Sequence, residues 1–585
     1  MKKVLVNLIK KIFIIIVVIA LAVVLQAVTI TSAQELSSMH NTFQEQSKNY
    51  KQYEKDITLS QIIYDEKSAK GLISLIVSNE ATTFQNIKHK KFIQDVYQRK
   101  SYRPIWFNNK GLIKEALYDL FNHIENDHTL EESGPIKTRY KKIKHKIATT
   151  NERTIQHELL LDLELTSLYR SFMGHHLYGS IQWWKFQNRL ASLRKRGVSA
   201  NWVTNNPKYD IADMLLRHKI SYIISRTTPS SFNYQKLYKE LSRLRKVQKA
   251  GGWKKIPNSS QLRYGKSGKV VKQLVNRLHS EGDYTCKQLT STFGPCLKKA
   301  IKRFQKRHGM RQTGRVSTTL LKKLNTSVNW KINKILLNLD RIKRLPDQAE
   351  ERYVMVNIPE FRLYYKEHGH DALDMRVIVG DKKHHTPIFS DKISFIVLNP
   401  YWFMPDSIVQ KEMIPGLLNN PDFLAQRGYE VRRSYSTKRP AIDTTNIDWA
   451  KVLRTGQTKK YKFMQPPGPR NALGKIKFKF PNNFAVYLHD TPTKKLFNQY
   501  PRAFSHGCIR ISKPNALLAS FAKNERFSYK HSKRILRGKE RKQYNLNSPI
   551  PVHILYLTSY VKSDGLVYYF PDIYHYDSKQ SRSIN

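Results

Sequence analysis

The chain has 585 residues, of which 40% are hydrophobic and 11% aromatic, which supports packed cores in about three or four domains and excludes a wholly disordered chain. Lys and Arg number 102 against 45 Asp and Glu, so the net charge is +57, and such a charge favours polyanionic partners, either nucleic acid or anionic membrane and wall surfaces. Three cysteines are too few for a scaffold built on disulfides.

The first 33 residues combine the features of an export signal. Four lysines precede an apolar run over residues 12–25, and small residues follow at 31–33, which is the order found in signal peptides. The apolar stretch is also nearly long enough to span a bilayer, so an uncleaved inner-membrane anchor is the alternative. Either interpretation places the rest of the chain in the periplasm and argues against a nucleic-acid partner.

Residues 34–251 are expected to form a mostly helical scaffold domain. Segments such as 155–169 and 237–247 repeat apolar residues at three- and four-residue spacing, which is the pattern of helices with one buried face. No cluster of catalytic residue types occurs here, so the sequence assigns no function to this region.

Residues 258–328 are expected to form a small unit of three helices. Gly265 and Gly268 bracket a turn, Ser267 is expected to cap the helix that follows, and Gly309 is expected to end the second helix. Apolar residues recur on one face of each helix, at positions 271, 274 and 278, then 297, 301 and 304, then 320, 321 and 324. Together with a Phe-Gln pair in the second helix, this spacing resembles the small three-helix peptidoglycan-binding domain.

Two of the three cysteines, Cys286 and Cys296, fall in a loop of this unit. An oxidising periplasm permits them to pair. The alternative is two separate thiols, because sequence alone does not give the distance between the Cα atoms. Pairing leaves Cys508 as the single free thiol.

From residue 350 the pattern changes to short β-branched and aromatic runs separated by turn residues, which predicts a β-rich domain over 350–560 and a multidomain α+β chain. The expected strands cover residues 353–358, 361–365, 375–379, 393–398, 484–488, 552–560 and 566–570. A long insertion rich in Pro, Trp and Tyr lies at about 400–474, and we expect it to be a lid over the site. Residues 561–585 are expected to be a terminal strand and a polar tail.

The residue types that carry chemistry lie in two short segments, Val-Tyr-Leu-His-Asp and Ser-His-Gly-Cys-Ile-Arg. A thiol is only slightly ionised at neutral pH, so a nucleophilic Cys508 needs a base, and the imidazole of His489 suits that role. Gly507 permits a tight turn that aims the N–H groups of Gly507 and Cys508 at one point, as an oxyanion hole. Arg510 adds positive charge near the sulfur and is a candidate to hold a substrate carboxylate.

Taken singly, each of these residues has a plainer explanation. An isolated cysteine is usually a small buried apolar residue, and an isolated histidine is usually a hydrogen-bonded core or surface residue. His506, Cys508 and His489 together also suggest zinc, but no fourth ligand stands at a recognisable spacing.

The combination resembles the L,D-transpeptidase family, whose YkuD-type catalytic domain carries a strand-end histidine followed by Ser-His-Gly-Cys-hydrophobic-Arg. Thr386 and Pro387 after Gly380 are similar to the early strand and turn of that domain. The stretch that begins at Asn399 resembles the large YcbB-like members, which combine a helical scaffold, a peptidoglycan-binding domain and a catalytic domain with an inserted capping subdomain.

The resemblance implies a role for each site residue. Cys508 is the nucleophile, His489 is the general base and acid, and the backbone carbonyl of Asp490 orients the imidazole. Gly507 shapes the oxyanion site, and no metal or organic cofactor is expected. The residues expected to contact substrate are Arg510, His506, Ser505 and Tyr487.

The implied reaction forms 3→3 cross-links between peptidoglycan stems through a cysteine acyl-enzyme, with release of D-alanine from tetrapeptide stems. Expected partners are stem peptides and glycan, with an anionic wall or membrane surface as a further partner and no nucleic acid. The alternatives are an L,D-carboxypeptidase that uses water, a lipoprotein-anchoring enzyme, and a non-catalytic wall-binding protein. The sequence leaves the oligomeric state open.

Overall fold

The structure is a computed structural model that describes residues 70–71, 73–74, 87–108, 111–149, 154–346 and 350–584. The expected signal peptide or anchor at residues 1–33 lies outside these described residues. Within them, no helix is both long and apolar enough to cross a membrane. The chain divides into two units, one of residues 1–176 and 209–227 and the other of residues 177–208 and 228–585, and each is described by itself.

The first unit is helical, as the apolar spacing predicts. In α4 (Lys114–Asn126) the buried residues are Leu117, Leu120, Phe121 and Ile124, which recur every three or four positions. The other helices with most of their length in this unit are α3 (Lys90–Arg99), α5 (Pro135–Thr149), α6 (Ile155–Tyr178), α8 (Ile211–Arg217) and α9 (Ile220–Thr227). Two short strands, β1 (Phe107–Asn108) and β2 (Gly111–Leu112), pair with each other.

The second unit begins with helices that pack on one another and on its sheet. Its first helix is α7 (Trp183–Lys195). In α10 (Tyr234–Lys249) the expected leucine face, including Leu237 and Leu241, is buried. This face packs with α14 (Val328–Ile342) and with residues of the neighbouring strands in one apolar cluster.

Between α10 and α14 lies a small helical unit with its own core. It contains α11 (Lys269–Ser280), α12 (Pro295–Arg307) and α13 (Thr318–Leu324), whose apolar faces meet in a single cluster. Gly309 follows α12 with a φ of 65°, as expected of a helix-ending glycine. The expected Ser267 cap is wrong: the residue before α11 is Gly268, and Ser267 Oγ instead hydrogen-bonds Thr292 Oγ1 at 2.9 Å, because Ser267 and Thr292 form an isolated β-bridge.

Cys286 and Cys296 form a disulfide with a Cα–Cα distance of 6.5 Å. The bond closes the loop between α11 and α12, and both residues pack against the core of the small unit. Cys508 is therefore the single free cysteine of the chain.

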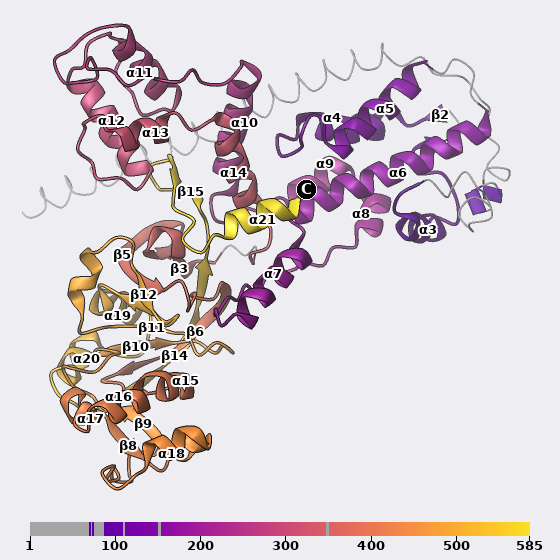
Figure 1. Ribbon diagram of the computed structural model, residues 1–585. Helices are drawn as coiled ribbons and strands as arrows, with labels where there is room; N and C mark the ends of the chain where they lie inside the picture. Colours follow the sequence, from indigo (N-terminus) through magenta and orange to yellow (C-terminus); the bar gives the residue numbers. More distant parts are fainter. Residues whose placement is uncertain are drawn as a thin grey trace, which may run out of the picture. The chain divides into compact units, whose positions relative to one another are not determined.

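Nine strands among the described residues form one sheet in the order β12-β5-β13-β11-β10-β6-β14-β3-β4 (Figure 1). β4 also pairs with β5, so the strands from β5 to β4 form a closed ring of pairings. β12 lies outside this ring and pairs with β5. The strands are β3 (Arg352–Asn357), β4 (Arg362–Glu367), β5 (His370–Gly380), β6 (Phe389–Leu398), β10 (Ile476–Lys479), β11 (Leu488–His489), β12 (Ala503–Ser505), β13 (Ile509–Ile511) and β14 (Lys542–Leu555).

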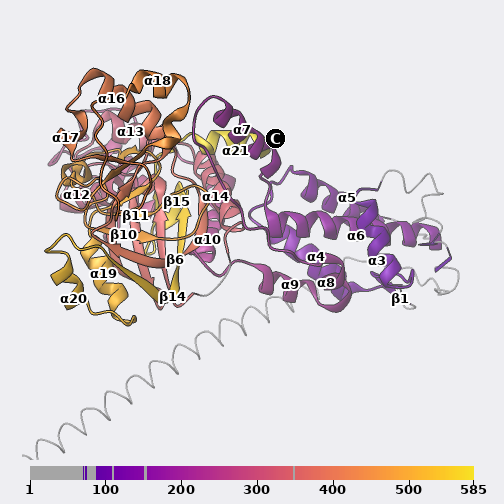
Figure 2. The same cartoon turned by 90° about the horizontal axis from the view of Figure 1, so that it is seen from below.

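The sheet encloses a large apolar core, to which helices contribute. Helices α19 (Pro514–Ala522) and α20 (Tyr529–Ile535) lie beside the sheet (Figure 2). They supply part of the core, including Leu517, Phe521 and Ile535. A second pair of strands, β15 (Ser559–Val561) and β16 (Val567–Tyr569), forms a separate ribbon.

The expected strand over 484–488 is mostly wrong, because only Leu488 belongs to β11. The Asn482 side-chain oxygen accepts hydrogen bonds from the backbone N–H groups of Phe484 and Val486, both at 3.1 Å. The Asn482 side chain thus binds backbone N–H groups that would otherwise hydrogen-bond to a neighbouring strand. Ala485 between them has a φ of 53°, which is incompatible with a strand.

The insertion between β6 and β10 is a folded subdomain (orange in Figure 1). A three-stranded sheet, β7 (Trp402–Phe403), β9 (Lys462–Gln465) and β8 (Glu430–Arg432), gives it a frame. Its apolar cluster is its own, with Met413, Val431, Trp449 and Phe463 buried. Its helices are α15 (Asp406–Ile408), α16 (Ile414–Asn419), α17 (Phe423–Arg427) and α18 (Trp449–Arg454), with helical turns at η3 (Val409–Met413) and η4 (Gln457–Lys460).

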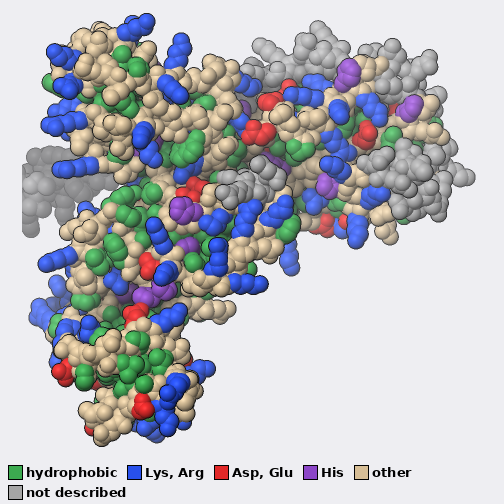
Figure 3. Space-filling model, viewed as in Figure 1, with side chains coloured by type: hydrophobic (Ala, Val, Ile, Leu, Met, Phe, Trp, Pro, Cys, Tyr) green, Lys and Arg blue, Asp and Glu red, His purple; other side chains and the backbone are tan. Residues whose placement is uncertain are grey.

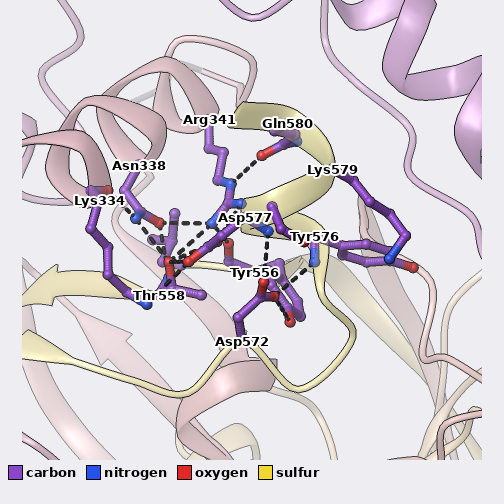
Figure 4. A network of polar contacts seen from close by, with 12 residues as sticks. Lys334, Asn338, Arg341, Tyr556, Thr558, Asp572, Tyr576, Asp577, Lys579 and Gln580 are labelled. Atoms are coloured by element: carbon purple, nitrogen blue, oxygen red, sulfur yellow. Dashed lines mark hydrogen bonds and ion pairs between the residues drawn. The ribbon is translucent and has the colours of Figure 1, made fainter. Parts of the chain in front are cut away.

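The C-terminal segment is not the polar tail that its composition suggests. It contains β16 and the helix α21 (Tyr576–Ile584), and Tyr576 is fully buried. Asp577 pairs with Arg341 at 2.7 Å and with Lys334 at 3.0 Å, both on α14 (Figure 4). These partners come from distant sequence, so composition alone does not reveal that the tail is anchored.

The excess positive charge is spread over the face of the described residues that Figure 3 shows. On the face shown in Figure 3, Lys and Arg side chains are scattered over the described residues and do not gather in one stripe. A distribution of this kind attracts polyanions diffusely and does not by itself mark a binding site.

Candidate active site

Two neighbouring strands bring the predicted residues together. β11 and β13 run parallel, with Leu488 opposite Ile509 and His489 opposite Arg510. Leu488 and Ile509 are fully buried in the core. Because side chains alternate between the two faces of a strand, His489 and Arg510 point to the other face. Cys508 precedes Ile509, so it shares this face with His489.

The loop before Cys508 is held by hydrogen bonds of its own. Ser505 Oγ donates to the Cys508 carbonyl at 2.6 Å and accepts from the Gly507 N–H at 3.2 Å. The φ of Gly507 is 109°, which side chains rarely tolerate. The Gly507 N–H is therefore occupied, contrary to the expectation that it points at an oxyanion, and the Cys508 N–H is the remaining donor of the pair.

Ser505 differs from its expected role as well. Its side chain is only 2% exposed and its hydroxyl is engaged in the loop on both sides. It therefore shapes the turn that presents Cys508 and does not line an accessible pocket.

Thr386, a position that sequence reasoning noted without a role, anchors the same loop. Its hydroxyl donates to the Gly507 carbonyl at 2.9 Å and accepts from the Gly380 N–H at 2.8 Å. Gly380 has no room for a side chain, because a Cβ there would collide with the backbone of His384. Tyr574 from the C-terminal segment donates to the Gly380 carbonyl at 2.7 Å.

His489 is oriented as expected by the carbonyl of Asp490, which lies 2.5 Å from Nδ1. Nδ1 therefore carries the proton, and Nε2 has a lone pair. Burial, followed by the charge of Arg510, lowers the pKa of His489 to about 3, so the ring is neutral at physiological pH. The Asp490 carboxylate turns away and binds the Lys475 N–H at 3.0 Å and the Lys494 ammonium.

Cys508 is half-buried and protonated in this state. Burial raises the pKa of its thiol, while the Tyr487 backbone and hydroxyl and the charges of Lys477 and Arg510 act in the opposite direction. The thiol donates to the carbonyl of Ala485 at 3.7 Å. The resting pair is thus a neutral thiol and a neutral imidazole.

Lys477 is a site residue that sequence reasoning missed. It lies opposite His489 in the ladder between β10 and β11, and its Nζ is 3.7 Å from the centre of the Tyr487 ring. Burial, followed by the charge of Lys479, lowers its pKa to about 8. The alternation of apolar and polar residues in β10 indicates that Lys477 lies on the polar face of the strand. Only the pairing of β10 with β11 shows that His489 lies opposite it.

Among the described residues, no carboxylate acts on Lys477 or Arg510, and Arg510 Nε is buried without a hydrogen-bond partner. Buried cations are usually paired. The charges of Lys477 and Arg510 beside the Cys508 thiol are therefore suited to bind a carboxylate of a ligand.

The insertion reaches this loop through one ion pair. His506 Nε2 lies 2.8 Å from the Glu412 carboxylate of the insertion, and the His506 ring packs against that of His384 at 4.3 Å between centroids. His506 and Glu412 are both partly exposed. Across the described residues, no cluster of three or more His, Cys, Asp or Glu is arranged to hold a metal ion.

Three family models match the chain. Residues 351–523 match the L,D-transpeptidase catalytic domain, residues 91–241 match a scaffold domain, and residues 267–324 match a family described as "Putative peptidoglycan binding domain". The first match includes the site residues, and the last covers the small helical unit.

Among curated proteins, the chain is 31% identical over 252 residues to a Haemophilus influenzae protein named "Putative L,D-transpeptidase". The alignment covers 43% of this chain, and the chain spans about half (49%) of the length of that relative. Among solved structures, an L,D-transpeptidase from Stackebrandtia nassauensis is 16% identical with a TM-score of 0.20 and covers 52% of this chain and 96% of its own. One from Xylanimonas cellulosilytica is 14% identical with a TM-score of 0.17 and covers 51% and 100%.

Proposed function

Because its catalytic domain places the chain in the L,D-transpeptidase family, we propose that it forms 3→3 cross-links between peptidoglycan stems through an acyl-enzyme on Cys508. The observation that carries this proposal is the shared sheet face on which Cys508, His489 and Arg510 meet. The substrate is a tetrapeptide stem that ends in D-alanine, and the site needs neither a metal nor an organic cofactor for the steps below.

In the first step the sulfur of Cys508 attacks the carbonyl of the third stem residue. The thiol proton leaves the Ala485 carbonyl and passes to His489 Nε2 as the S–C bond forms, which avoids a free thiolate in a buried site. His489 then gives this proton to the departing nitrogen, the C–N bond breaks, and D-alanine leaves. The low pKa of the imidazole favours rapid return of the proton.

In the second step the side-chain amine of a neighbouring stem attacks the thioester. The new C–N bond forms, the S–C bond breaks, and the amine proton returns through His489 to the sulfur. Water in place of the amine makes the protein an L,D-carboxypeptidase, and a lipoprotein lysine makes it an anchoring enzyme, because all three reactions share the acyl-enzyme.

The substrate is recognised by positively charged side chains and by a backbone N–H group near the sulfur of Cys508. Arg510 and Lys477 bind carboxylates of the stem, supported by their lack of a described acidic partner. The Cys508 N–H supplies the oxyanion donor of the loop, since the Gly507 N–H is bonded to Ser505. Tyr487 and His506 line the approach to Cys508.

The insertion serves as a lid that excludes water during the amine step. The Glu412–His506 ion pair supports this role, because it joins the insertion to the loop that carries Cys508. The proposed bounds are residues 1–33 for a signal peptide or anchor, 34–251 for the scaffold, 258–328 for the peptidoglycan-binding domain, 350–560 for the catalytic domain with its lid at about 400–474, and 561–585 for the terminal segment. Export places the protein in the periplasm, beside peptidoglycan and anionic wall or membrane surfaces.

The test incubates the purified chain with disaccharide-tetrapeptide and follows the products by mass spectrometry. We expect a cross-linked dimer that has lost one D-alanine, and no product from Cys508→Ala. A tripeptide alone indicates the carboxypeptidase. Products that match those of Cys508→Ala would refute the proposed reaction and leave a non-catalytic wall-binding protein as the alternative.

A further inference from the structure

The C-terminal segment closes a turn that lies beside the loop of Cys508. The Tyr574 hydroxyl donates to the Gly380 carbonyl at 2.7 Å and accepts from the Thr386 N–H at 3.2 Å. Gly380 and Thr386 are the two ends of this turn, and the Gly380 N–H also donates to the Thr386 hydroxyl at 2.8 Å. Tyr574 is buried together with both ends of the turn, so loss of its hydroxyl would take a partner from buried backbone groups.

The same turn holds the backbone before Cys508 at two points. At one end of the turn, the Asp381 N–H donates to the Ser505 carbonyl at 2.9 Å. At the other end, the Thr386 hydroxyl donates to the Gly507 carbonyl at 2.9 Å. The backbone just before the thiol therefore lies where the two ends of the turn hold it.

Further contacts fix the Tyr574 ring against the turn. The ring of His385, which belongs to the turn, stacks on it with 3.9 Å between centroids, and His385 Nδ1 lies 2.8 Å from the Tyr576 hydroxyl. The Tyr574 N–H donates to the Tyr556 hydroxyl at 2.9 Å. Tyr574 and Tyr576 thus hold the turn together, although Tyr574 lies 194 positions after Gly380 in the chain.

The C-terminal segment is itself anchored on α14. The Asp572 carboxylate accepts from the N–H groups of Tyr576 and Asp577, at 2.8 and 2.9 Å, in the first turn of α21. Asp577 in turn binds Arg341 and Lys334 of α14 (Figure 4). Because Arg341 and Lys334 are buried, displacing Asp577 would leave buried charges without a partner. The segment is therefore held firmly at the end opposite to the turn.

We propose that the C-terminal segment, residues 572–580, positions the nucleophile, and that Tyr574 is the positioning residue. Its hydroxyl keeps the turn from Gly380 to Thr386 closed, and the closed turn holds the Cys508 loop where the thiol shares a face with His489. Tyr574 makes its contacts with the turn, so it acts on the sulfur only through that turn. The inference rests on the proposed function for the reaction that benefits, whereas the positioning is a property of the loop itself.

Hydrogen–deuterium exchange of the full chain, read by mass spectrometry, tests the positioning without substrate. Tyr574→Phe keeps the ring and removes the hydroxyl, and we expect the peptide over residues 503–510 to exchange about tenfold faster. Tyr576→Phe should act in the same direction. Tyr365→Phe is the matched control, because Tyr365 is also buried and its hydroxyl binds Glu367 on β4, away from the turn. Unchanged exchange in Tyr574→Phe and Tyr576→Phe, or equal acceleration in Tyr365→Phe, would overturn the inference.

Turnover of disaccharide-tetrapeptide separates positioning from binding. We expect Tyr574→Phe to lower kcat by about ten- to hundredfold and to leave KM within about twofold, because the thiol is misplaced while Lys477 and Arg510 still bind the stem. In the Thr386→Val background, Tyr574→Phe should lower kcat little further, since both residues act through one turn.

Two kinetic results would overturn the inference. One is a loss in Tyr574→Phe that falls on KM while kcat is unchanged. The other is a double variant with Thr386→Val whose loss in kcat is the full product of the two single losses, because independent sites behave in that way. No turnover by the unchanged chain, together with faster exchange in Tyr574→Phe, would count against the proposed reaction and would still support the positioning of the loop.

Discussion

Lys477 lies directly opposite His489 on the neighbouring strand, and no carboxylate among the described residues pairs with it. Burial and the nearby Lys479 lower its pKa to about 8, so it is charged at neutral pH and loses its charge slightly above it. In the proposed reaction, a cation at this position stabilises a carboxylate on the substrate and negative charge on the sulfur of Cys508.

Lys477→Met should lower kcat/KM for tetrapeptide by about tenfold or more, because a charge-assisted hydrogen bond is lost. In the unchanged chain, activity that depends on this charge is present below pH 8 and falls above it. Lys477→Arg should move that fall to higher pH, since a guanidinium stays protonated. The measurement is kcat/KM from pH 6 to 10. Lys392→Met, an exposed lysine on β6, is the control, and an unshifted alkaline limb in Lys477→Arg would count against the role.

Thr386→Val should disorder the loop that carries Cys508. The substitution keeps the shape of the side chain and removes the hydroxyl that joins Gly380 to Gly507. We expect a loss of roughly 1–3 kcal/mol in the free energy of unfolding, because two buried backbone groups lose their partner. The rate of Cys508 alkylation should change as well. Thr386→Ser keeps the hydroxyl and should remain close to the unchanged chain; equal losses in both variants would rule out the hydrogen bonds as the cause.

Acid should destabilise the fold partly through His489. Its pKa is about 3 in the folded chain and about 6.5 when unfolded. Between these values the unfolded state binds a proton that the folded state does not, so the free energy of unfolding falls as pH drops. From pH 7 to pH 5 this group contributes about 2 kcal/mol of that fall.

Denaturant unfolding at pH 7 and pH 5 measures this effect. His489→Gln should reduce the difference between the two pH values by about 2 kcal/mol. His370→Gln, an exposed histidine at the start of β5, should leave it as it is. An undiminished difference in His489→Gln would mean that the imidazole is not held neutral.

The disulfide should leave one reactive thiol in the native chain. Cys286 and Cys296 are bonded, so a thiol reagent should modify Cys508 alone without reductant and all three cysteines after reduction and denaturation. Replacing both bonded cysteines with serine should destabilise the small helical unit by roughly 2–3 kcal/mol, because the loop they close is short. Modification of three thiols in the oxidised native chain would contradict the pairing.

The sequence by itself predicted the features that depend on residues close together in the chain. Helical spacing such as that of Leu237 and Leu241 repeats within a few residues, so it identifies helices without knowledge of their neighbours. The pair of Cys508 and His489 is also recognisable, because the two short segments that contain them together resemble the pattern of the L,D-transpeptidase family. The role of the Asp490 carbonyl came from the resemblance to the L,D-transpeptidase family, and the structure places this oxygen 2.5 Å from Nδ1 of His489.

What the tertiary structure decided depends on contacts between distant segments. The sequence placed a strand over 484–488, which Asn482 prevents by taking its backbone donors. It counted the Gly507 N–H and Ser505 as available to substrate, although they bond to each other. The position of Lys477 in the site becomes visible only through the register of β10 and β11, which places it opposite His489. Local periodicity reports which face of an element is buried, whereas the partner on that face is set by the folding of the whole chain.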